Sequence, residues 1–161
     1  MADTQSEIVF GNVTFGWRDP VTDEEMVELV DSHGGRPSAG WWARIHPHSL
    51  GWVTARLNDG TLVGFVNVAT DGGDHAFLID TKTHGAHQHK GIGTRLVRLA
   101  ATHAKAAQCE WLHVDWDPGL ATFYLDACGF RPTEAGLIHL PTLATSDVGE
   151  SGPRVSDPPT S

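Results

Sequence analysis

The sequence predicts one α/β domain in which helices cover a mixed sheet, and three observations support this prediction. Strand-like segments surround a single helix in the first half, and the second half reads strand–helix–strand–helix. Asn58-Asp59-Gly60 between two apolar segments is a strong β-hairpin signal. The segment that starts at Ile92 has apolar residues at helical spacing, with basic residues beside them.

The first half is expected to be mainly β-structure. A helix should begin after Thr22, because Glu25 lies three residues further on and completes a capping box, and it should end at Gly34-Gly35. The segment 36–49 is rich in tryptophan and histidine and is expected to be irregular. Strands are expected at residues 8–10, 13–17, 52–57 and 61–69.

The second half is expected to carry the site. A strand is predicted over 75–83, and its apolar run 76–79 is typical of a strand covered on both faces. The helix from Ile92 should be followed by a strand over 111–116, a short helix over 120–128 and a last strand over 137–140. From residue 141 prolines and serines predict a disordered tail, so the expected domain spans 1–140 and the tail 141–161.

Charge and composition exclude several classes of protein. Twenty acidic residues against eleven basic ones give a net charge of −9, whereas nucleic-acid binding normally requires a basic patch, so we expect no nucleic-acid partner. No apolar run approaches the roughly 20 residues that a membrane helix needs. The absence of a secretory signal and the presence of only two cysteines predict a soluble, cytoplasmic protein.

The segment from Gln88 to Thr94 is the most informative in the chain. It lies between an expected strand and an expected helix, so its backbone N–H groups stand at a helix N-terminus, where they lack intrahelical partners. Glycine at 91 and 93 allows an anion to approach the backbone, which is typical of phosphate binding. A plain turn with glycine at a helix start is the alternative, because a single Gly-x-Gly occurs in many unrelated chains.

This segment and its surroundings resemble the GNAT superfamily of acetyl-coenzyme A-dependent N-acetyltransferases. Gln88-His89-Lys90-Gly91-Ile92-Gly93 is similar to the superfamily's coenzyme A signature, Gln/Arg-x-x-Gly-x-Gly/Ala. The resemblance continues, in the family's order, through the strand before it and through Trp111–Trp116, Ala121–Tyr124 and Cys128–Phe130. It implies an α/β fold of the α+β type, with a mostly antiparallel sheet, a central parallel strand pair and flanking helices.

The resemblance also implies which residues would bind acetyl-CoA, the expected cosubstrate. The backbone at the end of the strand before the signature would pair with the pantetheine arm, and the signature amides would hold the pyrophosphate. Asp117 stands where members often place an asparagine that binds the arm, and an ionised carboxylate can accept but not donate a hydrogen bond. The implied cofactor-binding residues are Thr81, Lys82, Thr83, Gln88, His89, Lys90, Gly91, Ile92, Gly93, Thr94 and Asp117.

Two residues are implied as catalytic. Tyr124 occupies the family's tyrosine position and could donate a proton to the departing thiolate, with core packing as the alternative. Gly129-Phe130 lies one residue further from it than is usual, and one extra residue turns an α-helix by about 100°. Asp80 is the first candidate for the base that accepts a proton from the amine, ahead of His113 and Asp115.

The expected acceptor is a small cationic amine, with a protein amine as the alternative, and a homodimer is left open. Acceptor recognition should come from residues 31–49, where Trp41-Trp42 could cover a cation. His84, His87 and His89 raise the question of a metal, but the loop has no cysteine and no glutamate-rich partner, so no metal site is expected. A non-catalytic domain that binds or senses acyl-CoA is the alternative function.

Overall fold

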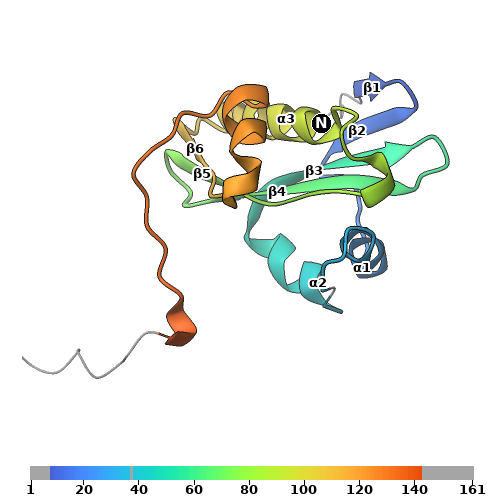
Figure 1. Ribbon diagram of the computed structural model, residues 1–161, viewed down its shortest axis with the longest axis horizontal. Coiled ribbons are helices and arrows are strands. Elements are labelled where there is room, and N and C mark those ends of the chain that lie inside the picture. The colour runs from blue at the N-terminus through green and yellow to red at the C-terminus, as the bar shows by residue number, and fades with distance from the viewer. Residues whose placement is uncertain (1–7, 37, 143–161) are drawn as a thin grey trace, which may run out of the picture. The chain divides into compact units, whose positions relative to one another are not determined.

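The computed structural model describes residues 8–36 and 38–142, and its centre is one six-stranded sheet (Figure 1). The strands are hydrogen-bonded in chain order, antiparallel from β1 to β5, with β6 parallel to β5. This confirms the predicted fold class, with the parallel pair at one edge of the described sheet. The strands are β1 (Ile8–Phe10), β2 (Val13–Trp17), β3 (Ser49–Leu57), β4 (Leu62–Thr70), β5 (His75–Thr83) and β6 (Trp111–His113).

The chain separates into two compact units, Met1–Arg131 and Pro132–Ser161. The sheet and the three α-helices belong to the first unit. In the described part of the second unit, the strand expected over 137–140 is wrong: the chain there is irregular and leads into a short 3₁₀ turn, η5 (Leu140–Thr142). Its apolar side chains are 70–82% exposed, so burial of these side chains does not stabilise a strand there. The boundary at 140 stays a prediction, and residues 143–161 lie outside the described part of the chain.

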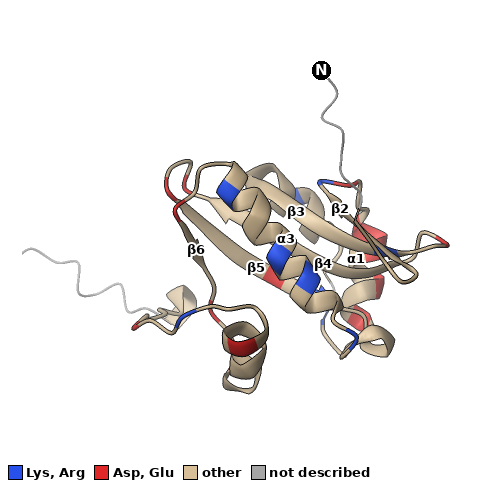
Figure 2. Cartoon of the chain, turned by 90° about the horizontal axis from the view of Figure 1, so that it is seen from above, with Lys and Arg blue, Asp and Glu red and all other residues tan. Residues whose placement is uncertain are grey.

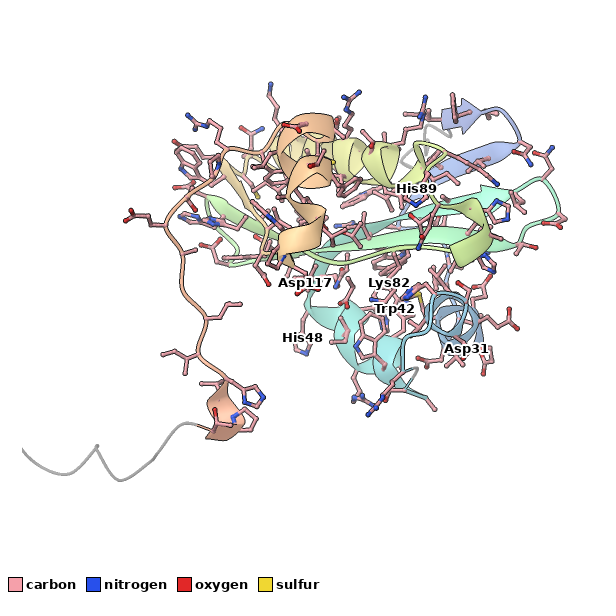
Figure 3. The ribbon with its side chains drawn as sticks, viewed as in Figure 1. Asp31, Trp42, His48, Lys82, His89 and Asp117 are labelled. Atoms are coloured by element: carbon pink, nitrogen blue, oxygen red, sulfur yellow. The ribbon has the colours of Figure 1, made fainter. Side chains whose placement is uncertain are left out.

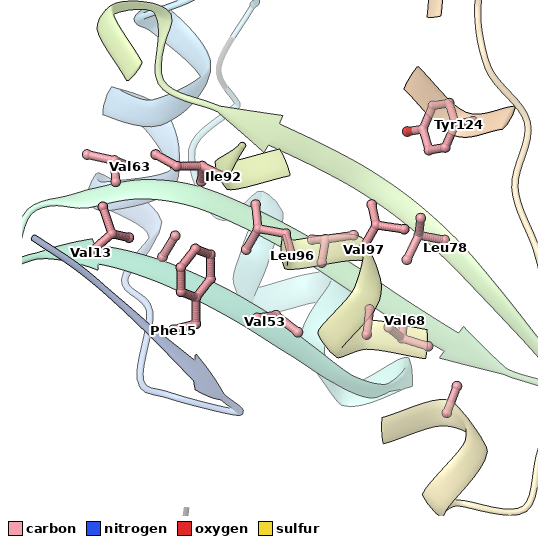
Figure 4. Close-up of a cluster of buried hydrophobic side chains, with 14 of the residues drawn as sticks. Val13, Phe15, Val53, Val63, Val68, Leu78, Ile92, Leu96, Val97 and Tyr124 are labelled. Carbon is pink, nitrogen blue, oxygen red and sulfur yellow. The ribbon is translucent and has the colours of Figure 1, made fainter. Parts of the chain in front are cut away.

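Helices cover both faces of the sheet (Figure 1). The helix α3 (Ile92–Ala106) packs on one face, and α1 (Asp23–Asp31) and α2 (Trp41–Ile45) lie on the other. The larger core lies between the sheet and α3, and part of it is drawn in Figure 4. It is built from alternate residues of the strands and from one stripe of α3, as the helical spacing predicted. Its fully enclosed members include Phe15, Val53, Val66, Val68, Leu96, Val97 and Ala100.

A second, smaller core lies under α1 and α2, where Met26, Leu29 and Trp42 pack on Leu62 and Phe65. The adjacent tryptophans behave differently, as expected of neighbours on a helix: Trp42 is buried, and Trp41 is partly exposed.

The N-terminus of α1 confirms the predicted capping box. The Thr22 hydroxyl accepts a hydrogen bond from the Glu25 amide, and the Glu25 carboxylate accepts one from the Thr22 amide. Glu25 also forms an ion pair with Arg56 on β3, and this pairing holds the pKa of its carboxyl below the ordinary value. The cap therefore ties the start of the helix to the sheet.

The expectation that residues 76–79 are covered on both faces is wrong. Ala76 and Leu78 are buried against α3, but Phe77 on the opposite face is 40% exposed. On that face α1 approaches β5 only further along, at Asp80 and Lys82. The strand expected over 111–116 is also shorter, because β6 ends at His113.

We predict that Thr22→Ala lowers the free energy of unfolding by about 1 kcal/mol, because an orphan amide loses its cap. Thermal or chemical denaturation measures this change. Thr102→Ala is the matched control: this exposed threonine lies inside α3, where alanine is the better helix former, so stability should not fall. Equal losses in both variants would contradict the capping role.

Candidate active site

The site is organised by a β-bulge in β5. Phe65 of β4 pairs with Lys82, and Asn67 pairs with Ile79, so two steps along β4 match three steps along β5. The extra residue lies at Asp80 or Thr81, and Asp80 has a left-handed backbone with φ of +56°. Such a backbone is uncommon for a residue other than glycine, and bulges of this kind often re-aim side chains at functional sites.

The bulge changes which face each side chain points to. Before it, Ala76 and Leu78 face α3. After it, the residues that face α3 are Thr81 and Thr83, as shown by contacts with Tyr124 and with the first turn of α3. Asp80 and Lys82 therefore face α1 and α2, whereas an unbroken alternation from Leu78 would have placed them on the α3 side.

Beyond the bulge the edge of β5 opposite β4 is free. β6 pairs with β5 only over His75–Phe77, and then the chain leaves the sheet. In the described part of the chain no strand pairs with this edge over Thr81–Thr83. The resulting gap offers backbone N–H and C=O groups to an extended ligand that adds like a strand.

The loop from Gln88 to Gly91 leads directly into α3. Its backbone is left-handed at His89 and Gly91, with φ of +59° and +78°, and Gly91 is the N-cap and provides no side-chain cap. No described residue accepts a hydrogen bond from the amides of residues 89–94. These amides and the positive end of the α3 dipole create a site suited to a phosphate group.

Side chains hold this loop and add positive charge. The Gln88 amide donates to the carbonyl of Thr83, 3.4 Å away, which ties the loop to the end of β5, and the Lys90 ammonium donates to the carbonyl of Ala86. The Arg95 guanidinium donates to the Gly91 carbonyl over 3.2 Å and lies on the ring of Phe10. Its place beside the loop is a feature that the motif alone does not reveal.

The main helices on the two faces of the sheet carry opposite charge (Figure 2). The helix α3 has three basic residues, Arg95, Arg98 and Lys105, and no acidic one, whereas α1 has five acidic residues and no basic one. An anionic ligand is therefore favoured on the α3 side and a cationic one on the α1 side.

Tyr124 lies in a π-helix, η4 (Phe123–Ala127), that follows a 3₁₀ turn, η3 (Pro118–Leu120). The wide turn is closed by hydrogen bonds from the Cys128 amide to Phe123 and from the Phe130 amide to Tyr124. It accommodates the extra residue before Gly129-Phe130 without rotating Tyr124 out of the core. The phenol ring packs between Trp116 and Phe130, with centroid distances of 5.4 Å and 5.9 Å.

The Tyr124 hydroxyl is turned toward β5 (Figure 4). Burial raises the pKa of the phenol above its ordinary value, and the nearby Asp115 carboxylate adds to this rise. A hydrogen bond with the Thr81 side chain acts in the opposite direction. A phenol is protonated at neutral pH even at its ordinary pKa of 10.0, and burial raises this pKa further, so Tyr124 carries a proton that it can donate into the gap beside β5.

Asp80 and Lys82 line a cavity of about 190 Å³ on the opposite face. The Lys82 ammonium lies 3.0 Å from the Asp80 carboxylate and 5.5 Å from the centre of the Trp41 ring. The rest of the cavity is lined by Met26, Val27, Val30, Arg36, Ser38 and Trp41. Figure 3 shows Lys82 and Trp42 on this side of the sheet and His89 on the other.

The other candidates fall outside this cavity or are already engaged. Asp117 is exposed at the start of η3, and its side chain caps no amide there. His113 ends β6 opposite Phe77 and makes a 2.7 Å hydrogen bond with His75. His84 accepts a hydrogen bond from the Ala86 amide and packs against His87, and no three potential metal ligands come together among the described residues.

Comparison with known proteins identifies the family. A model of the GNAT acetyltransferase family matches residues 17–130, which is most of the chain. The chain belongs to the GNAT family of acetyltransferases. It is therefore an acyltransferase enzyme, and the family named from residues 88–93 is confirmed. Among curated proteins, none matches the sequence.

Solved GNAT structures share the fold at low identity. A GNAT acetyltransferase from Streptococcus pneumoniae TIGR4 has 22% identity and a TM-score of 0.66, over 78% of this chain and 96% of that one. AAC(6')-Iy, in complex with a CoA-linked bisubstrate analogue, has 17% identity and a TM-score of 0.64, over 80% and 97%. The N-acetyltransferase YhbS from Escherichia coli, in complex with CoA, has 14% identity and a TM-score of 0.61, over 74% and 69%.

We predict that Tyr124, the only tyrosine in the chain, titrates above its ordinary pKa of 10.0 in the folded protein and near that value after denaturation. The folded state then holds a proton that the unfolded state has released, so stability should fall as the pH rises past the unfolded value. Phenolate absorbance measures the midpoint, and circular dichroism reports whether the fold persists.

Thr81→Val should raise this midpoint further, because Thr81 is the hydrogen-bond partner that opposes the shift. The control is Thr102→Val, which changes an exposed threonine on α3 and should leave the midpoint unchanged. A folded protein whose tyrosine titrates at or below 10.0 would contradict the buried placement.

Proposed function

We propose that this GNAT enzyme transfers an acetyl group from acetyl-CoA to the primary amine of a small cationic acceptor, by direct attack in a ternary complex. The carrying observation is the bulge in β5, which places Asp80 on one side of the strand and Thr81, with Tyr124, on the other. An amine can then approach from the α1 side while the thiolate leaves toward the α3 side. A protein amine remains the alternative acceptor.

The α3 side has the features that acetyl-CoA requires. The pyrophosphate would accept hydrogen bonds from the amides of residues 89–94, and Arg95 would add positive charge beside Gly91. The pantetheine arm would pair with the free edge of β5 at Thr81–Thr83. The CoA complexes of two structurally similar proteins support this choice of cosubstrate. Asp117 could then accept a hydrogen bond from the arm.

One proton transfer would take place on each face of β5: at Asp80 on the α1 side and at Tyr124 on the α3 side. The amine nitrogen attacks the thioester carbonyl after the Asp80 carboxylate has accepted a proton from the ammonium, directly or through water. As the carbon–sulfur bond breaks, the Tyr124 hydroxyl donates its proton to the sulfur. The phenol carries this proton at neutral pH, since its pKa lies above the ordinary value of 10.0. The second proton lost by the nitrogen returns through water to the Tyr124 phenolate.

The α1 side supports a cationic acceptor. Five acidic residues on α1 attract cations toward this face, and the cavity, which also contains Arg36 and Lys82, presents the Trp41 ring and the Asp80 carboxylate. In the described residues no helix is long and apolar enough to cross a membrane. The two cysteines are unpaired, which supports a reducing compartment, so the cytoplasm remains our proposed location.

We predict that Gly91→Glu weakens acetyl-CoA binding by more than about tenfold, or 1.4 kcal/mol, because a carboxylate would stand where the pyrophosphate binds. Isothermal titration calorimetry measures the affinity. Gly60→Glu is the matched control: this glycine also has a positive φ, in the β3–β4 turn, and a side chain there meets open space. Undiminished binding by Gly91→Glu would refute the loop assignment.

We predict that Tyr124→Phe lowers kcat by roughly a hundredfold while acetyl-CoA affinity stays nearly unchanged, because only the proton donor is lost. Steady-state turnover with a panel of amines, together with calorimetry, separates the two effects. Phe130→Leu is the control for packing around the ring, since Phe130 contacts Tyr124 but has no proton to donate. If kcat is unchanged in Tyr124→Phe, the phenol is not the acid.

A further inference from the structure

Lys82 has a side chain that the proposed reaction does not use. Its backbone belongs to the strand that would hold the pantetheine arm, but its side chain crosses to the acceptor side of the sheet because of the bulge. The side chain is only 16% exposed, and its ammonium lies 3.0 Å from the Asp80 carboxylate, against the face of Trp41. An alkylammonium group thus already occupies the cavity where an acceptor amine would bind.

This position satisfies the requirements for an acceptor. The amine touches Asp80, the proposed proton acceptor, through a direct hydrogen bond. Asp80 precedes Thr81, the hydrogen-bond partner of Tyr124, so the amine and the base lie on one side of the bulge and the acid lies on the other. An amine held in the correct place reacts far faster than one that must diffuse into it.

We propose that the enzyme acetylates its own Lys82. The inference rests on the proposed function, since it uses the same cosubstrate, base and acid. The Lys82 nitrogen, once its proton has passed to Asp80, forms a bond to the acetyl carbon of acetyl-CoA. The carbon–sulfur bond breaks, and the thiolate takes a proton from Tyr124. The nitrogen then loses its second proton, which returns through water to the Tyr124 phenolate. The products are an N-acetyllysine in the chain and free CoA.

The other two lysines provide an internal comparison. Lys90 and Lys105 are both exposed, and Lys105 lies on α3 at the opposite face of the sheet. Uncatalysed acetylation by acetyl-CoA favours exposed amines over a partly buried amine in an ion pair. Preferential modification of Lys82 therefore requires the geometry of the site.

Acetylation would also change the site itself. A neutral amide cannot pair with Asp80 or lie over Trp41 as a cation, so the carboxylate and the ring become available to an external ammonium. The unmodified lysine and the external acceptor compete for the same two groups.

The test incubates the purified protein with acetyl-CoA and follows acetylation of each lysine over time by peptide mass spectrometry. We expect Lys82 to be acetylated at least about tenfold faster than Lys105, and a molar equivalent of CoA to be released. Asp80→Asn should slow Lys82 labelling, and Lys82→Arg should abolish the fast phase. Lys105→Arg is the matched control and should leave the labelling of Lys82 unchanged.

Calorimetry with acetyl-CoA and turnover with an amine panel separate the two proposals. If acetyl-CoA binds and free amines are acetylated, while Lys82 reacts no faster than Lys105, the self-acetylation proposal is wrong and the proposed function stands. If acetyl-CoA does not bind, the proposed function fails and self-acetylation fails with it. If Lys82 reacts fast in wild type and equally fast in Gly91→Glu, the labelling is uncatalysed and the proposal is also overturned.

Discussion

The two-residue period of a β-strand is the constraint on which the site depends. A regular β5 would send Asp80 and Lys82 into the α3 core and Thr81 toward α1. The bulge interrupts that alternation once, so the carboxylate faces the acceptor cavity and the threonine faces Tyr124. At the bulge, Asp80 has a left-handed backbone conformation, which is uncommon for a residue other than glycine. The bulge at Asp80 therefore separates the face from which the amine would enter from the face toward which the thiolate would leave.

Electrostatics reinforces this division. The positive helix α3 and its unpaired N-terminal amides lie on the face opposite the acidic α1, with the sheet between them. Two charged substrates can therefore be attracted to the same strand from opposite faces. The net charge of −9 conceals this separation, because it sums over both faces. A wholly acidic surface would repel the cofactor, and a wholly basic one would repel a cationic acceptor.

Much of the fold was predictable because its signals are local. The capping box at Thr22 and Glu25, the hairpin at 58–60 and the loop before α3 each depend on residues within a few positions of one another. The bulge at Asp80 was not predictable from the sequence, because no glycine or proline marks it and only pairing with β4 fixes the register. The strand expected over 137–140 failed because apolar residues form a strand only where a partner accepts their backbone hydrogen bonds. The ion pair between Lys82 and Asp80 was not predicted, because the family resemblance gave a role only to the backbone of Lys82 and none to its side chain.

The π-helix around Tyr124 shows how packing can override local helix geometry. An inserted residue in an α-helix must either rotate the residues after it by about 100° or be absorbed in a wider turn. Rotation would have moved Tyr124 away from Thr81, or Phe130 away from the aromatic cluster, and left a buried ring without its contacts. The wider turn sacrifices only ideal hydrogen-bond geometry over Phe123–Ala127. The π-helix therefore keeps the phenol beside β5 and in contact with Trp116 and Phe130.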